Sequence, residues 1–280
     1  MKNNLINIKT MLTQFWAQKK YCEFPETDLS KGAGTSDTMM LYQIYKQKKL
    51  NMFSFHRCRR PQDSIFNWKN RLFCHTQCQV ITMFNNSKTS ELLMFKESLK
   101  YIFDHLGLDF NQHTLTFWED NWKQETINAI GTGWEVKLDG IEIAQITYFH
   151  KVLGKKLDLI PIEFAYGLER LCSILQDQEN IMDINYFNKI KYCDLFYDFE
   201  NQISQTIEKK EEIIQFLKSE IIIVQRSIEY KNLYQFIEHL IKCSHWLNLL
   251  SINKQISIQE YKIWLKKVID ISMLYHENLH

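Results

Sequence analysis

Glycine and proline are scarce in this chain of 280 residues. It contains 8 glycines and 3 prolines, against roughly 20 and 14 for average usage. All the glycines lie between Gly32 and Gly167, and the last proline is Pro161. Because these two residue types supply most turns and helix stops, we expect the turns in the first 170 or so residues and helices in the remainder.

Long apolar runs, a charge imbalance and paired cysteine motifs are also missing. No apolar run reaches the roughly 18 to 20 residues of a membrane helix, and the start of the chain resembles an amphipathic helix rather than a leader. The seven scattered cysteines contain no CxxC pair, which favours a reducing cytoplasm. The net charge of +1 gives no global field for nucleic acid. We therefore expect a cytoplasmic protein that makes no membrane contact and that needs a local patch or a second subunit to hold RNA.

Hydrophobic periodicity divides the chain into a mixed part and a helical part. Strands are predicted over 52–60 and 71–82, and Asp139-Gly140 joins two alternating strands in a type I′ hairpin. The last helix is expected to bury one face, made of Ile258, Tyr261, Leu265, Val268, Ser272 and Tyr275. The fold class is α+β: an antiparallel sheet flanked by helices, then an all-helical C-terminal region. We expect the boundary between residues 1–180 and 181–280.

Polar residues on predicted sheet faces are the first sign of a site. Period-two alternation puts Arg71, His75, Gln77 and Gln79 on one face of the strand 71–82. In the Asp-Gly hairpin the alternation sets Lys137 opposite Glu142, as a cross-strand ion pair, and Trp134 opposite Gln145. Gln145 shares its face with apolar residues, so a pocket is favoured there over bulk solvent.

Arginines gather at the ends of three predicted elements. Arg57 and Arg59 point one way on their strand and Arg60 the other, and Arg71 begins the return strand. Guanidinium groups on two strands that face one loop suit a triphosphate, although a basic cluster can also be a solvated face. Arg170 opens a helix, where it opposes the macrodipole unless a phosphate or a paired carboxylate lies in front of it. Both readings stay open from these residues alone.

A set of motifs then occurs in a specific order. GAGTS, RRP with a loop and NRL, QCQV, EDNW, GWEVKLDGIEIAQITYF and YGLERL follow one another. The set resembles the alpha subunit of bacterial two-subunit glycyl-tRNA synthetase, a class II aminoacyl-tRNA synthetase, over about residues 10–176. A weaker match continues through YCDLF, HWLNLL and ISIQE. The chain departs from the family pattern in the loop DSIFNWKN (63–70), and at 251–253 it has Ser-Ile-Asn.

The resemblance implies a site for each substrate. YGLERL is similar to the third class II motif and RCRRP through CQV to the second, with Arg59, Arg60 and Arg170 as catalytic residues. The residues implied for ATP are Arg59, Arg60, Arg71, Gln77, Glu169 and Arg170. Those implied for glycine are Thr35, Gln79, Trp122, Gln145, Glu163 and Tyr166. Magnesium is expected at Glu119 and Glu142.

The resemblance also implies an activity and its partners. Such a subunit activates glycine with ATP to glycyl-adenylate and, with a beta subunit, transfers it to tRNA(Gly). It works as a homodimer within an alpha2beta2 assembly. Two alternatives remain at this point: a structural subunit that has lost activation, and a class II-like enzyme that makes another aminoacyl-adenylate. Retention of the arginines favours the active subunit.

Overall fold

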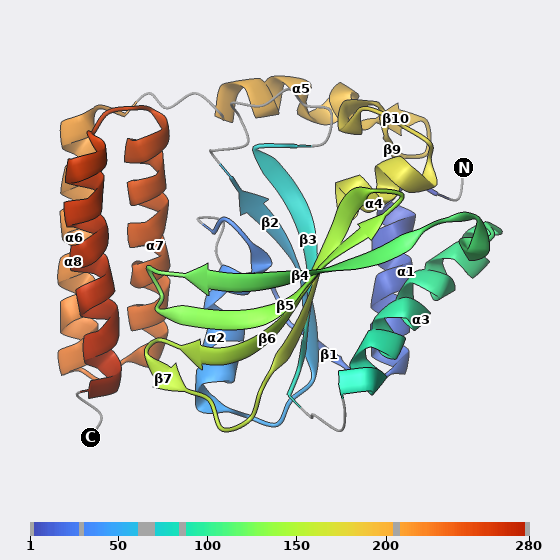
Figure 1. Ribbon diagram of the computed structural model, residues 1–280. Helices are drawn as coiled ribbons and strands as arrows, with labels where there is room; N and C mark the ends of the chain where they lie inside the picture. The colour runs from blue at the N-terminus through green and yellow to red at the C-terminus, as the bar shows by residue number, and fades with distance from the viewer. Residues whose placement is uncertain (1–2, 28–30, 61–70, 84–87, 204–207, 278–280) are drawn as a thin grey trace.

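One mixed sheet forms the centre of the protein (Figure 1), whose computed structural model describes residues 3–27, 31–60, 71–83, 88–203 and 208–277. The strand order is β1-β2-β3-β8-β6-β5-β4, with β7 paired to β6. Only the β1–β2 ladder is parallel among the described strands of this sheet. Its strands are β1 (Cys22–Glu23), β2 (Met52–Arg59), β3 (Cys74–Thr82), β4 (Leu115–Gln124), β5 (Ala129–Leu138), β6 (Ile141–Val152), β7 (Lys155–Lys156) and β8 (Ile162–Gly167).

The helices fall into an N-terminal group around the sheet and a C-terminal group, whose last three helices stand together at one end of the sheet while its first helix lies across the top of the view (Figure 1). The first group is α1 (Leu5–Gln18), α2 (Thr38–Lys46), α3 (Lys88–Leu106) and α4 (Leu168–Leu175). The second is α5 (Tyr192–Ile203), α6 (Lys210–Glu229), α7 (Leu233–Ile252) and α8 (Ile258–Glu277). The α+β class with an all-helical end is therefore confirmed. A small hairpin, β9 (Asn185–Phe187) with β10 (Ile190–Lys191), precedes α5, and the sequence pattern did not predict it.

Local chemistry explains several element boundaries. The Asn4 side chain accepts the backbone N–H of Asn7 and caps α1. Asp37 caps α2 in the same way through Met39 and Met40, because the first N–H groups of a helix have no partner within it. The predicted turn between β5 and β6 is confirmed: its two residues, Asp139 and Gly140, have φ values of 51° and 82°, the left-handed pair that a type I′ turn requires.

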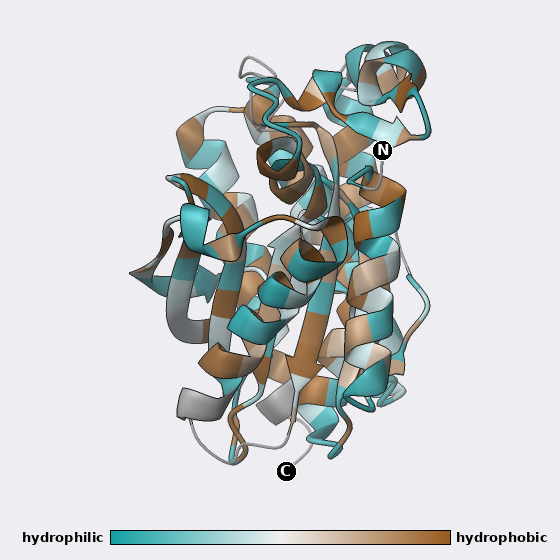
Figure 2. Ribbon diagram, turned by 90° about the vertical axis from the view of Figure 1, so that its right-hand side faces the viewer, coloured by the Kyte–Doolittle hydropathy of each residue, from teal (hydrophilic) through white to brown (hydrophobic). Residues whose placement is uncertain are grey.

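The larger core lies between the sheet and helices α1, α3 and α4. Figure 2 views this side, where the helices lie over the strands. Alternate residues of the strands, among them Cys78, Phe164 and Tyr166, are buried there against Trp16 and Phe95. The opposite face of the same strands is consequently left to carry the polar side chains.

A second core joins the helical end to the sheet. Met40 and Ile44 of α2, Phe149 of β6, and Phe236 and Leu240 of α7 belong to one buried cluster. The C-terminal helices are thus packed on the sheet and are not a free appendage. Among the described residues, no helix has the length and apolar character needed to cross a membrane.

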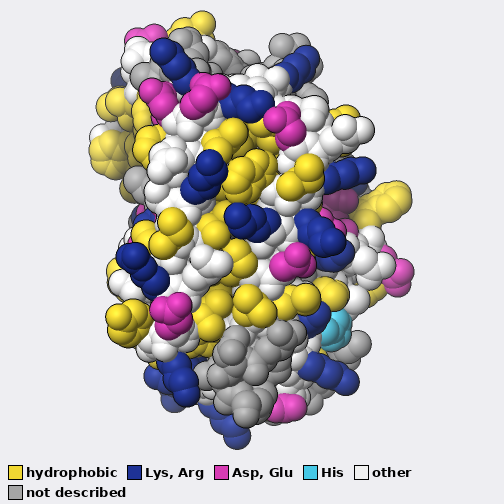
Figure 3. Space-filling view, turned by 90° about the vertical axis from the view of Figure 1, so that its left-hand side faces the viewer, with side chains coloured by type: hydrophobic (Ala, Val, Ile, Leu, Met, Phe, Trp, Pro, Cys, Tyr) yellow, Lys and Arg dark blue, Asp and Glu magenta, His cyan; other side chains and the backbone are white. Residues whose placement is uncertain are grey.

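The outward face of the helical end keeps several apolar side chains in contact with solvent. Figure 3 shows hydrophobic groups between lysines on this face. The exposed ones on α6 and α8 include Phe216, Ile222, Ile263 and Met273. The predicted burial of Ile258 is wrong, since it is 75% exposed: it starts α8, ahead of the stretch from Tyr261 onward that packs on the second core.

Candidate active site

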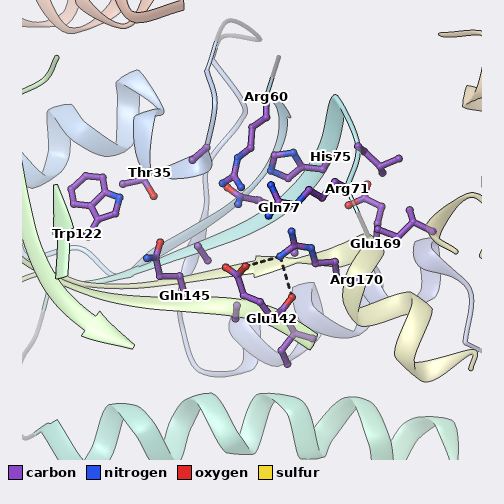
Figure 4. A pocket seen from close by; sticks show the side chains of 17 residues that line it. Thr35, Arg60, Arg71, His75, Gln77, Trp122, Glu142, Gln145, Glu169 and Arg170 are labelled. Atoms are coloured by element: carbon purple, nitrogen blue, oxygen red, sulfur yellow. Dashed lines mark hydrogen bonds and ion pairs between the residues drawn. The ribbon is translucent and has the colours of Figure 1, made fainter. Parts of the chain in front are cut away.

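The main cavity opens on the polar face of the sheet (Figure 4). Its floor contains Gln77 of β3, Gln145 of β6 and Gly167 of β8. Gln77 is in register with Gly167, and Ala165 is in register with both Gln79 and Gln145. In-register residues of neighbouring strands project on the same face, so the sheet itself gathers side chains that lie far apart in the chain.

Three arginines from three segments line this cavity: Arg60 after β2, Arg71 before β3 and Arg170 on α4. Arg60 Nε donates to the carbonyl of Gly32 at 2.8 Å. Arg170 Nη1 lies 2.7 Å from a carboxylate oxygen of Glu142 (Figure 4). Arg59 lines a neighbouring cavity together with Arg60. Of the three arginines predicted as catalytic, Arg60 and Arg170 therefore line the main cavity and Arg59 does not, while Arg71 joins them there.

The pKa of His75 is affected by the positive charges around the main cavity. Burial lowers the pKa of His75 well below its usual range, and the charges of Arg60, Arg170 and Arg57 lower it further. Its Nε2 is buried and has no hydrogen-bond partner among the described residues. The imidazole is therefore neutral at physiological pH and leaves one ring nitrogen to interact with a ligand.

Beneath the cavity, a buried carboxylate holds two of the residues predicted for glycine. Thr35 Oγ1 donates to Glu163 at 2.8 Å and 2.9 Å from its two oxygens, and Gln79 Nε2 donates to it at 2.5 Å. Burial raises the pKa of Glu163 to about 7, against hydrogen bonds that lower it. Glu163 and Gln79 are both fully buried, so Thr35 reaches the cavity and the other two residues support it from below.

The amide groups of Gln77 and Gln145 are oriented by their neighbours. Gln77 Oε1 accepts the N–H of Gly34 at 2.7 Å, which leaves its NH₂ to donate. Gln145 Nε2 donates to the carboxylate of Asp120, which leaves its carbonyl oxygen to accept. Gly34 permits this approach, because a Cβ there would lie 3.0 Å from the His56 ring. Trp122 closes the same end of the cavity.

Two sequence-based assignments are corrected by the sheet faces. Tyr166 lies on the opposite face from Gly167 and Ala165, fully buried, stacked on Phe95 and bonded to Ser98 at 2.7 Å. It does not line the main cavity, so the glycine contact is withdrawn. Tyr166 and Glu163 are three positions apart on β8, so the period-two alternation of a strand places them on opposite faces of the sheet.

Glu119 is the second correction. It is exposed on the face of β4 opposite to Trp122, whereas Glu142 lies in the main cavity. The two predicted magnesium ligands therefore do not meet. Within the described residues, no group of three acidic, histidine or cysteine side chains could hold a metal ion. Glu142 is the one member of the pair that fits a metal bound together with phosphate oxygens.

A β-bulge changed the predicted hairpin pairs. Lys137 is opposite Glu142 as expected, but the register shifts beyond Val136, so Gln145 faces Glu135 and Trp134 faces Ile146. The predicted Lys137–Glu142 ion pair is replaced by two others: Lys137 Nζ lies 3.4 Å from Glu135 and Glu142 pairs with Arg170. The bulge is what turns Glu142 and Gln145 toward the same cavity.

The edge of β3 is closed by two carboxylates, one of which sequence reasoning missed. Strand β8 ends at Gly167, and beyond it both oxygens of Glu169 accept the N–H of Thr76 at 2.9 Å. Glu200 of α5 accepts the N–H groups of Phe73 at 2.8 Å and Cys74 at 3.2 Å. Glu169 therefore supports the strand that ends the cavity, and it also lines the cavity itself.

The guanidinium of Arg57, on β2, lies near both of these carboxylates. It lies 3.5 Å from Glu169 and 3.8 Å from Glu200, and it donates to the Tyr192 hydroxyl at 2.8 Å. Burial raises the pKa of Glu200 to about 7 even though the N–H donors and Arg57 lower it. No local motif marks Glu200, because its partners lie 126 and 127 positions away in the chain.

The comparison with protein families assigns this chain to one of them. The family described as "Glycyl-tRNA synthetase alpha subunit" matches residues 5–278. The chain therefore belongs to the glycyl-tRNA synthetase alpha subunit family, whose members are aminoacyl-tRNA synthetases and hence ligases. The loop 63–70, where the sequence departs from the family pattern, lies outside the described residues.

Two solved structures are also similar to this chain. Both are pyrrolysyl-tRNA synthetases from Desulfitobacterium hafniense, each 11% identical to it. One alignment covers 67% of this chain and 76% of the other, with a TM-score of 0.43. The second covers 69% and 77%, with a TM-score of 0.45.

Proposed function

We propose that this chain uses ATP to activate glycine, releasing pyrophosphate, and that with a beta subunit it passes the glycyl group to tRNA(Gly). The observation that carries the proposal is the pairing of two environments in one cavity. Arg60, Arg71 and Arg170 line it together with the neutral hydrogen-bonding groups of Thr35, Gln77 and Gln145, and Thr35 and Gln145 lie toward Trp122 (Figure 4). Phosphates suit the first environment, and a small zwitterion suits the second.

The activation step requires positioning and charge neutralisation rather than a covalent group of the protein. A glycine carboxylate oxygen attacks the α-phosphorus of ATP, and the bond from that phosphorus to the pyrophosphate oxygen breaks. Arg60 and Arg170 neutralise the charge that develops on the phosphoryl oxygens, as preorganised donors do. When ATP binds, Arg170 exchanges its ion pair with Glu142 for a phosphate.

The amide orientations assign each end of glycine. The NH₂ group of Gln77 donates to the glycine carboxylate, and the carbonyl oxygen of Gln145 accepts from its ammonium group. Thr35 Oγ1, whose hydrogen points to Glu163, presents lone pairs to the same ammonium. Trp122 limits the space around the α-carbon. A divalent metal bound with ATP would be held by Glu142 and would add to the neutralisation of the phosphates.

The partners and organisation are proposals of the same kind. We assign activation to residues 1–180 and place the helical region 181–280 beside the beta subunit, in an alpha2beta2 assembly that works in the cytoplasm. The exposed apolar side chains of α6 and α8 (Figure 3) support a protein contact on that face, since large apolar patches mark interaction sites. The net charge of +1 supports a shared hold on tRNA.

Glycine-dependent exchange of pyrophosphate into ATP tests the activation directly. The chain purified with its beta subunit should catalyse exchange with glycine, and Arg60→Ala should lower the rate strongly. Lys46→Ala, at an exposed cation on the last turn of α2, is the matched control and should leave the rate unchanged. A wild-type complex without glycine-dependent exchange would favour the structural subunit as the function of this chain.

A further inference from the structure

A second cavity lies between helix α7 and the edge of the main cavity. We call it the α7 cavity; four of its lining residues come from α7, and the others come from β4, the end of β2 and the loop after residue 31. It shares Ala33, Arg60 and Trp122 with the main cavity. An occupant of the α7 cavity can therefore reach the proposed adenylate by passing Trp122 and Arg60.

The charges of the α7 cavity have one sign. Arg59, Arg60 and Lys123 line it, and no acidic side chain does so among the described residues. Lys123 is paired with Glu125 at 2.8 Å on the exposed surface, so the two arginines provide most of the positive charge. Phosphodiester groups are the ligands that such a basic groove attracts.

Polar residues in the C-terminal half of helix α7 line this cavity. The helix buries nine hydrophobic residues, yet Ser244, His245 and Asn248 line the cavity. Positions i and i+4 lie on one face of a helix, so Ser244 and Asn248 stand one above the other. This helix thus presents a hydroxyl, an imidazole and an amide to a basic groove.

Two π faces complete the cavity. Trp122 of β4 and His245 of α7 both line it, and successive bases of single-stranded nucleic acid stack on such side chains in a sequence-tolerant way. A basic groove with polar donors and stacking platforms, open to the site where a glycyl group is activated, has the chemistry of a path for a single-stranded RNA end.

We propose that the α7 cavity receives the single-stranded 3′ end of the tRNA and leads its terminal ribose past Trp122 to the glycyl-adenylate. This inference rests on the proposed function and deepens it. In the transfer step, the terminal hydroxyl oxygen bonds to the glycyl carbonyl carbon, the carbon–oxygen bond to the phosphate breaks, and AMP leaves with the electron pair. The hydroxyl proton passes to the departing phosphate or to water.

A charge introduced on α7 separates transfer from activation. In the complex with the beta subunit, Ser244→Glu should leave glycine-dependent pyrophosphate exchange unchanged and lower glycylation of tRNA at least about 10-fold, since like charges in contact disfavour binding strongly. Ser219→Glu, at an exposed position of α6, is the matched control and should leave both reactions unchanged.

The stacking role has its own test. His245→Ala should lower kcat/KM for tRNA about 5- to 100-fold, the range expected from removing one stacking platform, and His245→Phe should recover most of that loss. A photoreactive group on the terminal nucleotide of the tRNA should cross-link to residues 241–248. Exchange should stay normal in both variants.

Five results would overturn the inference. Normal glycylation by Ser244→Glu, or cross-links confined to other segments, would remove the RNA end from the α7 cavity. A raised KM for ATP in exchange would assign the cavity to the triphosphate, and loss of the beta subunit from the Ser244→Glu complex would assign it to a protein contact. Absence of glycine-dependent exchange in the wild-type complex would instead refute the proposed function, and this inference with it.

Discussion

Removing the carboxylate of Glu200 should weaken ATP binding although Glu200 does not line the main cavity, because this carboxylate fixes the start of β3. Its two oxygens accept the N–H groups of Phe73 and Cys74, and Arg71, which lines the main cavity, lies two residues before Phe73. Glu200→Ala leaves both N–H groups buried without an acceptor. Each such group costs about 1–3 kcal/mol, so unfolding should become easier by about 2–6 kcal/mol.

The Glu200→Ala substitution should affect the binding of ATP more than the binding of glycine. Arg71 is displaced when the start of β3 loosens, whereas Thr35, Gln77 and Gln145 are held by separate bonds. We therefore expect the KM for ATP to rise several-fold in pyrophosphate exchange, with a smaller change in the KM for glycine. Glu200→Gln keeps one acceptor oxygen and should lose about half as much stability.

The assay pairs equilibrium unfolding in urea with exchange kinetics. Asp198→Ala is the control, because Asp198 is an exposed acid two residues away on α5, and such a change should stay within about 0.5 kcal/mol. If Glu200→Ala unfolds at the urea concentration of the control and keeps the wild-type KM for ATP, the Glu200 carboxylate does not hold the strand as described.

Three further outcomes follow from the main cavity and one from the surface. Arg170→Ala should cost about 2–4 kcal/mol of transition-state stabilisation, measured as kcat/KM in exchange; near-normal exchange would contradict its role. The KM for glycine should rise by up to about tenfold per pH unit below pH 7. Burial raises the pKa of Glu163 to about 7, so below that pH Glu163 carries a proton that it donates to Thr35, and the threonine hydrogen turns toward the glycine ammonium. A KM for glycine that is flat from pH 6 to 8 would exclude this. Alanine should be activated at least about 10-fold less efficiently than glycine, and equal rates would remove Trp122 as the limit on the α-carbon. The chain alone should have the mass of a dimer in solution and should not glycylate tRNA efficiently; a monomer that does so would refute the proposed assembly.

Local sequence patterns predicted the helices, strands and turns better than they predicted which residues of neighbouring strands pair. The Asp139-Gly140 turn was predictable because its left-handed backbone requires those residue types. The pairing of Trp134 with Gln145 was wrong because a bulge between Val136 and the turn adds a residue to one strand, and no residue type at that place announces it. Tyr166 was misplaced for a simpler reason, since alternation from Glu163 already puts it on the apolar face.

The site residues that the sequence could not indicate act through long-range contacts. Glu200 resembles any acid on an amphipathic helix until β3 is placed beside it. The same holds for the polar residues Ser244 and Asn248 of α7, whose role depends on a cavity built mostly from other segments. The arginines were found because residue type and position restrict what a guanidinium at a strand end or helix start can do.

The second core sets a limit on how a gene for this protein can be divided. Met40 and Ile44 from the N-terminal third are buried in the same cluster as Phe236 and Leu240. A fragment that stopped near residue 180 would expose those side chains and would be expected to aggregate when expressed alone. Recombination that separated the segment containing α2 from the segment containing α7 would therefore divide one shared core.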